Sequence, residues 1–295
     1  MDECVLAIDF SHEKIEAAFV SGEGWVNAQA DLPLASLAAG EARPAGKLVS
    51  LLANKAKAAP LALKSAIVSL ACGLGPDGTR AVNHPAAAWL DDYPLAEELR
   101  AALGVPVRLI RRSHALLFYD LETLEIPPDS LVIGCYIDLH FDNAIWYRDG
   151  PLSGRNRASG NIAHLTLHGR EDACFCGRRG CVDLYGAGVR LRQIHTMIFP
   201  ETPLGEIFVR LGDHPILREY LAMMAYPVAV EADILAPDFI VIGGGIPAMP
   251  GFPRDRLREE IVRQSPALEA RILPSASDAA SGVACAGRYA FKRGF

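Results

Sequence analysis

Four residues between positions 164 and 181 have the types and the spacing of a metal site: His164, Cys174, Cys176 and Cys181. A disulfide between Cys174 and Cys176 would be strained, because only one residue separates them. Gly177 and Gly180 allow the segment to turn back tightly. One imidazole and three thiolates form a closed tetrahedral set for zinc, which leaves no position for a reacting water. The residues therefore predict a structural zinc site, in which His168 is an alternative nitrogen ligand that spacing alone does not exclude.

Length and composition argue against several classes of protein. The chain has 295 residues, of which 51% are hydrophobic, and a net charge of −6. A negative chain lacks the basic face that nucleic acid requires, and no apolar run reaches the roughly 18–20 residues of a membrane span. The segment MDECVLAIDF has no basic stretch followed by a long apolar run, so we expect no signal peptide. We therefore expect a cytoplasmic protein that binds neither nucleic acid nor membranes.

Apolar runs with strand character alternate with helical segments along both halves of the chain. Strands are predicted at 4–10 and 14–20, within 62–76, at 105–110, as a pair within 129–150 and within 237–247. Helices are predicted at 94–104, where Gly104 ends the helix, over most of 188–235, and at the end of 273–291. This alternation predicts an α/β architecture, with two lobes and a cleft between them.

Three motifs together resemble the ROK family of repressors, open reading frames and kinases. They are GNIAH at 160–164, CFCGRRGCVD at 174–183 and PDFIVIGGG at 237–245. The family typically has GEIGH, then CxCGxxGCxE with its first cysteine ten residues after the histidine, then a strand that ends in three glycines. The spacing here fits without a gap. Within the family, GGGIPAMPGFPRDRL and the tryptophan of AIWYRDG resemble D-allose kinases.

The resemblance implies a fold and an activity. The expected fold is actin-like, of the ribonuclease-H-like ATPase type, with an N-terminal lobe at 1–115 and a C-terminal lobe at 116–295; the last helix could return to the N-terminal lobe. The expected activity is ATP-dependent phosphorylation of a hexose, with a structural zinc ion that shapes the sugar pocket. Members of the family commonly form dimers, so a homodimer is one expectation.

The phosphate-binding segments depart from the family pattern. The family begins with Asp-x-Gly-Gly-Thr-Lys, whereas this chain has DFSHEK, which keeps Asp9 and Lys14, loses the glycines and adds Glu13. A second segment, Leu-Gly-Thr-Gly in the family, is IDLH at 137–140 and adds the negative charge of Asp138. The glycine turn is intact. The cofactor-binding residues that the resemblance carries over are Asp9, Lys14, Gly243, Gly244 and Gly245. We expect the binding of ATP and Mg²⁺ to be weak or absent.

The catalytic position departs further. Family kinases have an Asn-Asp pair in which the aspartate is the general base, and the alignment of VPVRLIRRSHALLFYD puts Arg111 and Arg112 on that pair. An arginine cannot act as a base, because its pKa exceeds about 12. Arg112 could instead hold an anionic ligand, or it could pair with a nearby acid such as Asp138.

The residues that the resemblance places around a sugar are Arg111, Arg112, Asn161, His164 and Asp183. Asn161 replaces the glutamate of GEIGH and loses its charge. Asp183 replaces the glutamate that follows the third cysteine; its alternative reading is an acid at the start of a helix.

Two functions remain open after this comparison. The first is a catalytically impaired sugar-kinase homologue that binds a small-molecule sugar or sugar derivative, in one version an anionic one, and acts as a binding or regulatory protein. The alternative is an active hexose kinase with a rearranged site, in which Asp138, Asp142 or Asp183 is the base. A DNA-binding repressor is disfavoured, because the first strand is predicted within ten residues of Met1, ahead of which no winged helix fits.

Overall fold

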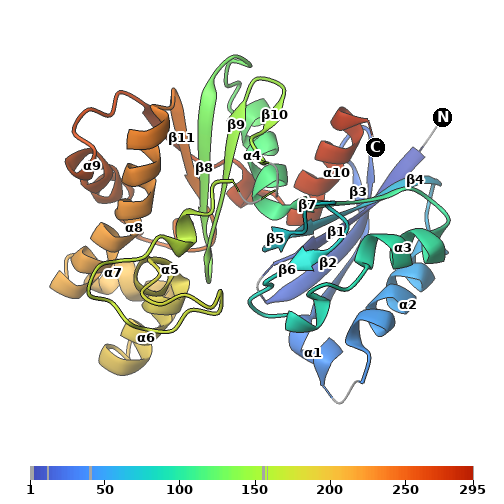
Figure 1. Cartoon of the computed structure of the whole chain (residues 1–295), viewed down its shortest axis with the longest axis horizontal. Coiled ribbons are helices and arrows are strands. Elements are labelled where there is room, and N and C mark those ends of the chain that lie inside the picture. Colours follow the sequence, from blue (N-terminus) through green and yellow to red (C-terminus); the bar gives the residue numbers. More distant parts are fainter. Residues whose placement is uncertain (1–2, 12, 40–41, 155–156, 158, 295) are drawn as a thin grey trace. The chain divides into compact units, whose positions relative to one another are not determined.

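The computed structural model describes residues 3–11, 13–39, 42–154, 157 and 159–294. The chain divides into two compact units, shown in Figure 1. The N-terminal unit comprises Met1–Glu125, Ser153–Ala158 and Ala279–Phe295, and the C-terminal unit comprises Ile126–Leu152 and Ser159–Asp278. Each unit contains its own apolar core.

The N-terminal unit contains a five-stranded mixed sheet in the order β3-β2-β1-β4-β7. Its strands are β1 (Glu3–Phe10), β2 (Lys14–Ser21), β3 (Val26–Pro33), β4 (Ala62–Leu70) and β7 (Val107–Arg111). The first three strands are antiparallel neighbours, whereas β1, β4 and β7 run parallel. The carboxyl ends of these three parallel strands therefore meet at one edge of the sheet.

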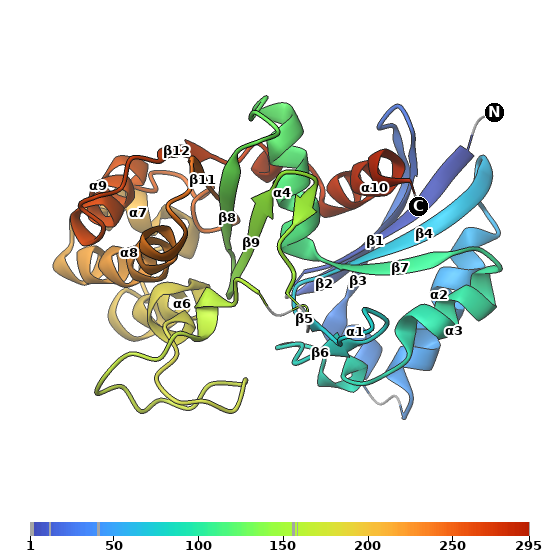
Figure 2. The same ribbon diagram turned by 45° about the horizontal axis from the view of Figure 1, so that its top comes forward.

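Helices cover both faces of this sheet, as Figure 2 shows, with α4 and α10 on one face and α2 and α3 on the other. The helices are α1 (Leu34–Ala38), α2 (Pro44–Ala56), α3 (Leu95–Leu103), α4 (Arg112–Thr123) and α10 (Gly282–Arg293). The unit also contains the short strands β5 (Gly73–Leu74) and β6 (Ala81–Val82) and the 3₁₀ turn η1 (Ala88–Leu90). As predicted, Gly104 ends α3 in a left-handed conformation, with φ 69°.

Alternation along β1 determines which side chains face which helices. Leu6, Ile8 and Phe10 belong to the apolar core that includes residues of α2 and α3. Asp9 consequently points to the opposite face, toward α10. Helix α10 approaches this face closely because it is rich in small residues: a Cβ on Gly287 would lie 2.5 Å from Val20 Cβ.

The C-terminal unit contains a second five-stranded sheet in the order β10-β9-β8-β11-β12. Its strands are β8 (Leu131–Ile137), β9 (Phe141–Tyr147), β10 (Gly150–Pro151), β11 (Phe239–Gly243) and β12 (Arg271–Pro274). Strands β8 and β9 form the predicted pair, joined by a turn at residues 138–140. Strand β11 lies between β8 and β12 and is parallel to both, so the glycine turn (residues 243–245) follows a central strand.

The remaining helices belong to the C-terminal unit. They are α5 (Asp183–Gly186), α6 (Gly188–Ile198), α7 (Ile207–Leu211), α8 (Pro215–Leu235) and α9 (Arg254–Gln264), with 3₁₀ turns η2 (Ile162–His164), η3 (Leu204–Glu206) and η4 (Ser277–Ala279). Alternate residues of β8 and β11 pack against apolar residues of α8 and α9. Within the described part of the chain, no helix is both long and apolar enough to cross a membrane.

The division between the units differs from the boundary at residue 115 that the sequence suggested. That boundary falls inside α4, and α4 packs against α10, so the whole helix belongs to the N-terminal unit. The last helix, α10, also belongs to the N-terminal unit, as does the short segment Ser153–Ala158. A packed helix cannot be divided between two cores, and the division therefore follows α4 at Glu125.

Candidate functional site

The four predicted metal ligands lie together in the C-terminal unit. The donor atoms of His164, Cys174, Cys176 and Cys181 are all within 4.8 Å of one another. Cys174 Sγ lies 3.6 Å from His164 Nδ1, and Cys176 Sγ lies 3.7 Å from Cys181 Sγ. His168, the alternative nitrogen ligand, is exposed and does not belong to this group.

The distances from Cys174 to His164 and from Cys176 to Cys181 match those of a tetrahedral zinc site. With Zn–S bonds of about 2.3 Å and a Zn–N bond of about 2.0–2.1 Å, a regular tetrahedron places two sulfurs about 3.8 Å apart and a sulfur and a nitrogen about 3.6 Å apart. A disulfide would require two sulfurs at about 2.05 Å, and all three cysteines are free. The residues therefore fit a structural zinc ion and do not fit a disulfide.

Burial affects the two kinds of ligand differently. Burial lowers the pKa of His164, which favours the neutral imidazole that binds a metal. Burial raises the pKa of the Cys174 and Cys181 thiols, whereas zinc requires thiolates. A bound cation would offset this penalty, because it stabilises the deprotonated thiol.

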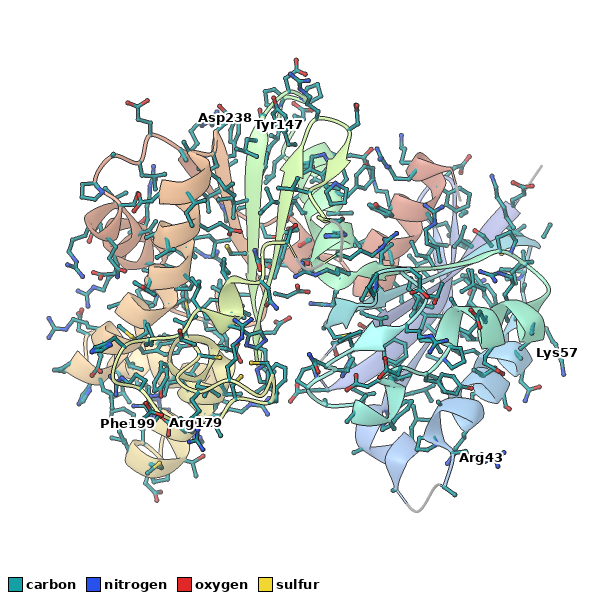
Figure 3. All side chains as sticks on the ribbon, in the orientation of Figure 1. Arg43, Lys57, Tyr147, Arg179, Phe199 and Asp238 are labelled. Carbon is teal, nitrogen blue, oxygen red and sulfur yellow. The ribbon has the colours of Figure 1, made fainter. Side chains whose placement is uncertain are left out.

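The cysteine loop (residues 164–181) is shaped by turns that its glycines permit. Gly177 donates its backbone N–H to Cys174 O at 3.0 Å and closes the first turn. Gly180 has φ +66°, and a Cβ there would lie 2.3 Å from Arg170 O, so a larger residue does not fit. Arg178 and Arg179 of this loop are both exposed, and Arg179 is labelled in Figure 3. Arg178 Nη1 donates to His164 O at 3.1 Å, and Arg179 Nη1 donates to Glu171 O at 3.0 Å.

Asp183, predicted near the sugar, is fully buried, and both of its carboxylate oxygens accept hydrogen bonds. The backbone N–H of Phe141 donates to Oδ1 at 2.8 Å, and His140 Nδ1 lies 2.6 Å from Oδ2. Phe175 of the cysteine loop contacts both His140 and His164 edge-on, with ring centroids 5.0 and 5.2 Å apart. Asp183 therefore joins the end of the cysteine loop to the 138–140 turn.

His140 was missed from the sequence as a partner of Asp183. It occupies the last position of the segment that replaces a phosphate-binding loop. The only sequence signal was an imidazole in a turn between two strands, because the two residues are 43 positions apart.

The other predicted sugar-side residues occupy different environments. Asn161 is exposed and contributes to a groove of about 240 Å³, lined mainly by apolar residues of β9, η2 and α8. Arg111 is buried and is the residue just before α4. His114, the third residue of α4, is also buried; desolvation, together with Arg111 and Arg157, lowers its pKa to about 3. These groups hold His114 neutral.

Asp9 and Arg112 form an ion pair within the N-terminal unit. Arg112 Nε lies 3.1 Å from Asp9 Oδ2, and the Asp9 side chain is fully buried while that of Arg112 is 15% exposed. Asp9 Oδ1 also accepts a short hydrogen bond from the hydroxyl of Ser69. Ser69 stands opposite Asp9 in the pairing of β1 with β4, so the three groups meet where the parallel strands end.

The start of α10 completes the surroundings of Asp9. A Cβ on Gly282 would lie 2.0 Å from Asp9 Oδ2, so glycine is required for the carboxylate to approach the helix. A helix N-terminus carries a partial positive charge that favours a carboxylate. Of the two alternatives for Arg112, the structure therefore has the pairing with an acid, and that acid is Asp9.

Lys14 and the hairpin before it are also engaged. Lys14 Nζ lies 3.1 Å from Glu16 Oε1 and 3.2 Å from Asp31 Oδ2. Burial lowers the pKa of Lys14, but its hydrogen bonds to these two acids raise it, and the net change is upward. Ser11 Oγ accepts from Lys14 N at 3.1 Å and from Glu13 N at 3.4 Å. His12 of this hairpin lies outside the described residues.

The glycine turn donates its backbone N–H groups to carboxylates. Gly244 N donates to Asp278 Oδ1 at 2.7 Å, and Gly245 N donates to Asp138 Oδ1. Gly243 also has no space for a side chain, because a Cβ there would lie 2.3 Å from Ser275 Cβ. Asp278 was missed in the sequence, where it is one of several polar residues before the last helix.

A family model of the ROK family matches residues 5–288 of the chain. The chain belongs to the ROK family. An N-acetyl-D-glucosamine kinase of Escherichia coli O127:H6 is 27% identical over 193 residues, which span 60% of this chain and 63% of that kinase. An N-acetylmannosamine kinase of Vibrio cholerae serotype O1 is 24% identical over 209 residues, which span 69% of this chain and 72% of that kinase.

Solved structures of ROK proteins share the fold. A ROK family glucokinase from Streptomyces griseus, in complex with glucose and AMPPNP, has a TM-score of 0.79 at 17% identity and covers 96% of this chain and 98% of its own. A ROK family transcriptional regulator, a homologue of the E. coli MLC protein, has a TM-score of 0.75 at 16% identity and covers 98% of this chain and 78% of its own. The predicted actin-like, ribonuclease-H-like ATPase fold is confirmed. The resemblance to D-allose kinases stays a prediction.

Proposed function

We propose that this ROK family member is a catalytically impaired sugar-kinase homologue that binds a hexose or a hexose derivative and acts as a binding or regulatory protein. One observation carries the proposal: the ion pair between Arg112 and the buried Asp9. In the resemblance to the family, Arg112 stands where the general base belongs, and Asp9 is the retained carboxylate of the first phosphate-binding segment.

Because Arg112 is always protonated, it cannot supply the proton acceptor that the kinase reaction needs at this position. Phosphoryl transfer to a sugar hydroxyl requires an acceptor for the hydroxyl proton, and a positioned base typically contributes about 10²–10⁴-fold in rate. A guanidinium cannot accept that proton at neutral pH. Arg112 Nε also lies 3.1 Å from Asp9 Oδ2, so the positive charge of the guanidinium is next to the carboxylate.

The residues described above do not fit Mg-ATP. A cation at Asp9 would have to displace the guanidinium of Arg112. The ammonium group of Lys14 is held between Glu16 and Asp31. We therefore assign no step to a nucleotide or to magnesium in this protein.

The alternative function, an active kinase with a relocated base, finds little support among the acids named for it. Asp183 is fully buried, and both of its oxygens accept hydrogen bonds. Asp138 accepts a hydrogen bond from Gly245 N. Asp142 is a buried residue of β9.

Zinc is part of the proposal as a structural ion. His164, Cys174, Cys176 and Cys181 would hold it, and a closed set of four protein ligands leaves it no catalytic position. Such an ion would fix the cysteine loop and, through Phe175 and Asp183, the orientation of His140. The protein side of the sugar site would then include this rigid loop.

The class of ligand proposed here, a hexose or hexose derivative, is inferred from the related ROK proteins. Two of them are named as kinases of N-acetylated amino sugars, and one solved ROK protein is in complex with sucrose. Because Asp9 already balances the charge of Arg112, we expect neutral hexoses and N-acetylhexosamines to bind at least as well as sugar acids and sugar phosphates. Thermal-shift and calorimetric titrations with both groups of compounds test this order.

The decisive experiment measures ADP release and sugar phosphate formation by the wild-type protein with Mg-ATP and a panel of hexoses. We expect no turnover, together with saturable binding of at least one sugar. Arg112→Asp should not restore turnover, since the phosphate-binding segments are altered as well; Arg100→Asp, an exposed position on α3, is the matched control. Sustained sugar phosphorylation by the wild type would overturn the proposal, and so would a failure of every sugar to bind.

A further inference from the structure

Two adjacent backbone N–H groups of the glycine turn donate to two carboxylates from distant parts of the C-terminal unit. Asp138 is 107 positions from Gly245, and Asp278 is 34 positions from Gly244. Successive N–H groups in a turn with a left-handed residue form a concave site that favours anions. Gly244 supplies that conformation, with φ +99°. The turn thus has the backbone of an anion site, and its acceptors are side chains of the same chain.

The surrounding backbone fixes this arrangement. Gly188 N, at the start of α6, donates to Asp138 O at 2.9 Å, and Val189 N donates to Leu139 O at 2.9 Å. A Cβ on Gly188 would lie 2.4 Å from Asp138 O, so the helix and the 138–140 turn are in direct contact. Ile246 N donates to Ile137 O at 2.9 Å. These backbone hydrogen bonds therefore hold the Asp138 carboxylate next to the glycine turn.

The segment that carries Asp278 is equally constrained. Ser275 N donates to Ile242 O at 2.9 Å and continues the ladder beside β11. Ser277 N donates to Ser275 Oγ at 3.0 Å, which bends the chain just before Asp278. A side chain on Gly243 would collide with Ser275. The two carboxylates thus approach the turn from two independent and ordered segments.

The hairpin of the N-terminal unit shows the same principle independently. The N–H groups of Glu13 and Lys14 donate to the hydroxyl of Ser11. In both segments, backbone N–H groups donate to side chains of the chain itself.

We propose that Asp138 and Asp278 are built-in anions that occupy the anion-binding site of the glycine turn. The site is complete without an external ligand, and it excludes inorganic phosphate, pyrophosphate and the polyphosphate of nucleotides by occupancy. Removal of both acceptors leaves an empty site for a phosphate-like anion. This inference concerns residues other than Arg112 and does not depend on the ion pair with Asp9.

The test compares two ways of removing the same charges. Asp138→Ala/Asp278→Ala removes both charge and acceptor, whereas Asp138→Asn/Asp278→Asn removes the charge and keeps an oxygen that can accept from the turn. Asp129→Ala/Asp149→Ala removes two exposed acids of the same unit and is the control for net charge. Each protein is titrated with pyrophosphate at fixed ionic strength by calorimetry.

We expect the Ala/Ala variant to bind pyrophosphate at least tenfold more tightly than the wild type, the Asn/Asn variant and the control. Equal gains in the Ala/Ala and Asn/Asn variants would show that repulsion alone excluded the anion and would overturn occupancy. A folded Ala/Ala variant that binds pyrophosphate no more tightly than the wild type would overturn the inference as well.

A measurement on the wild type keeps the inference testable if the Ala/Ala variant does not fold. The amide resonances of Gly244 and Gly245 should not move in a pyrophosphate titration to millimolar concentration. Saturable shifts of both resonances would refute the proposal. None of these readouts involves sugar phosphorylation, so a failure here leaves the proposed function standing. Turnover by the wild type with Mg-ATP would overturn the proposed function, whereas occupancy of the glycine turn is decided by the pyrophosphate titrations.

Discussion

Replacement of Arg112 by alanine would leave the Asp9 carboxylate buried without its cation. Removal of one partner of a buried ion pair typically costs about 3–5 kcal/mol. Here the hydroxyl of Ser69 and the N-terminus of α10 remain next to the carboxylate, and the Arg112 side chain is 15% exposed. We therefore expect a loss at the lower end, about 3 kcal/mol in the free energy of unfolding.

A double-mutant cycle with Asp9→Asn separates the energy of the Asp9–Arg112 ion pair from the other effects of replacing Arg112. Asp9→Asn keeps the size of the side chain and removes its charge, so it should relieve most of the penalty in the Arg112→Ala background. We expect a coupling energy of about 2 kcal/mol between the two positions, within the range of about 0.5–3 kcal/mol for residues in contact. Arg100→Ala, on the exposed face of α3, should change stability by less than about 0.5 kcal/mol.

Tryptophan fluorescence allows the unfolding of the N-terminal unit to be followed by itself. The chain has three tryptophans, of which Trp25 and Trp89 belong to the N-terminal unit and Trp146 belongs to the C-terminal unit. In a Trp146→Phe background, urea titrations of the four proteins of the cycle give the coupling energy. A loss of about 3 kcal/mol would lower the melting temperature by about 6–12 °C, at about 2–4 °C per kcal/mol for a domain of about 150–250 residues.

Either of two results would show that the ion pair between Asp9 and Arg112 does not stabilise the fold. One is an Arg112→Ala protein whose stability is within about 0.5 kcal/mol of the wild type. The other is a coupling energy below about 0.5 kcal/mol, which would show that the two residues act independently.

Metal analysis of the purified protein should give one zinc per chain, and Cys176→Ser should lose the metal and melt earlier, whereas His168→Ala should retain both metal and stability; a zinc-free wild-type protein would contradict this. Gly180→Ala should destabilise the protein more than Gly169→Ala, since both positions have positive φ but only a Cβ at 180 would meet backbone atoms within 4 Å; equal losses by denaturant titration would contradict the packing argument. His114, whose pKa falls from 6.5 unfolded to about 3 folded, should contribute a loss of stability as pH falls below 6.5, about 2 kcal/mol by pH 5. The slope of stability against pH should flatten between pH 5 and 6.5 in His114→Gln, and an unchanged slope would exclude this contribution.

The sequence identified the elements that local pattern determines. The strands at 4–10 and 14–20, the helix that ends at Gly104 and the pair of strands around residues 138–142 correspond to β1, β2, α3, β8 and β9. Each has a periodicity that depends only on near neighbours in the chain. The boundary between the units was placed inside α4, because the contact of α4 with α10 joins segments that are far apart in sequence.

The grouping of the four candidate metal ligands was also predictable from the sequence alone. Its four ligands lie within 18 consecutive positions, and turns at glycines bring ligands with such short spacing together. What spacing left open was the choice between His164 and His168, and the structure includes His164 in the group of donor atoms.

The chain's own sequence determined which family motifs were retained and which were lost. Only the tertiary structure decided what the replacements do. Arg112 and Asp9 are 103 positions apart, and Asp138 and Gly245 are 107 apart. The sequence suggested Asp138 as one possible acid for Arg112, whereas in the structure Arg112 pairs with Asp9. Such pairings depend on which strand ends meet at one edge of a sheet and on whether a helix start has room for a carboxylate, and neither is encoded in the spacing of the residues themselves.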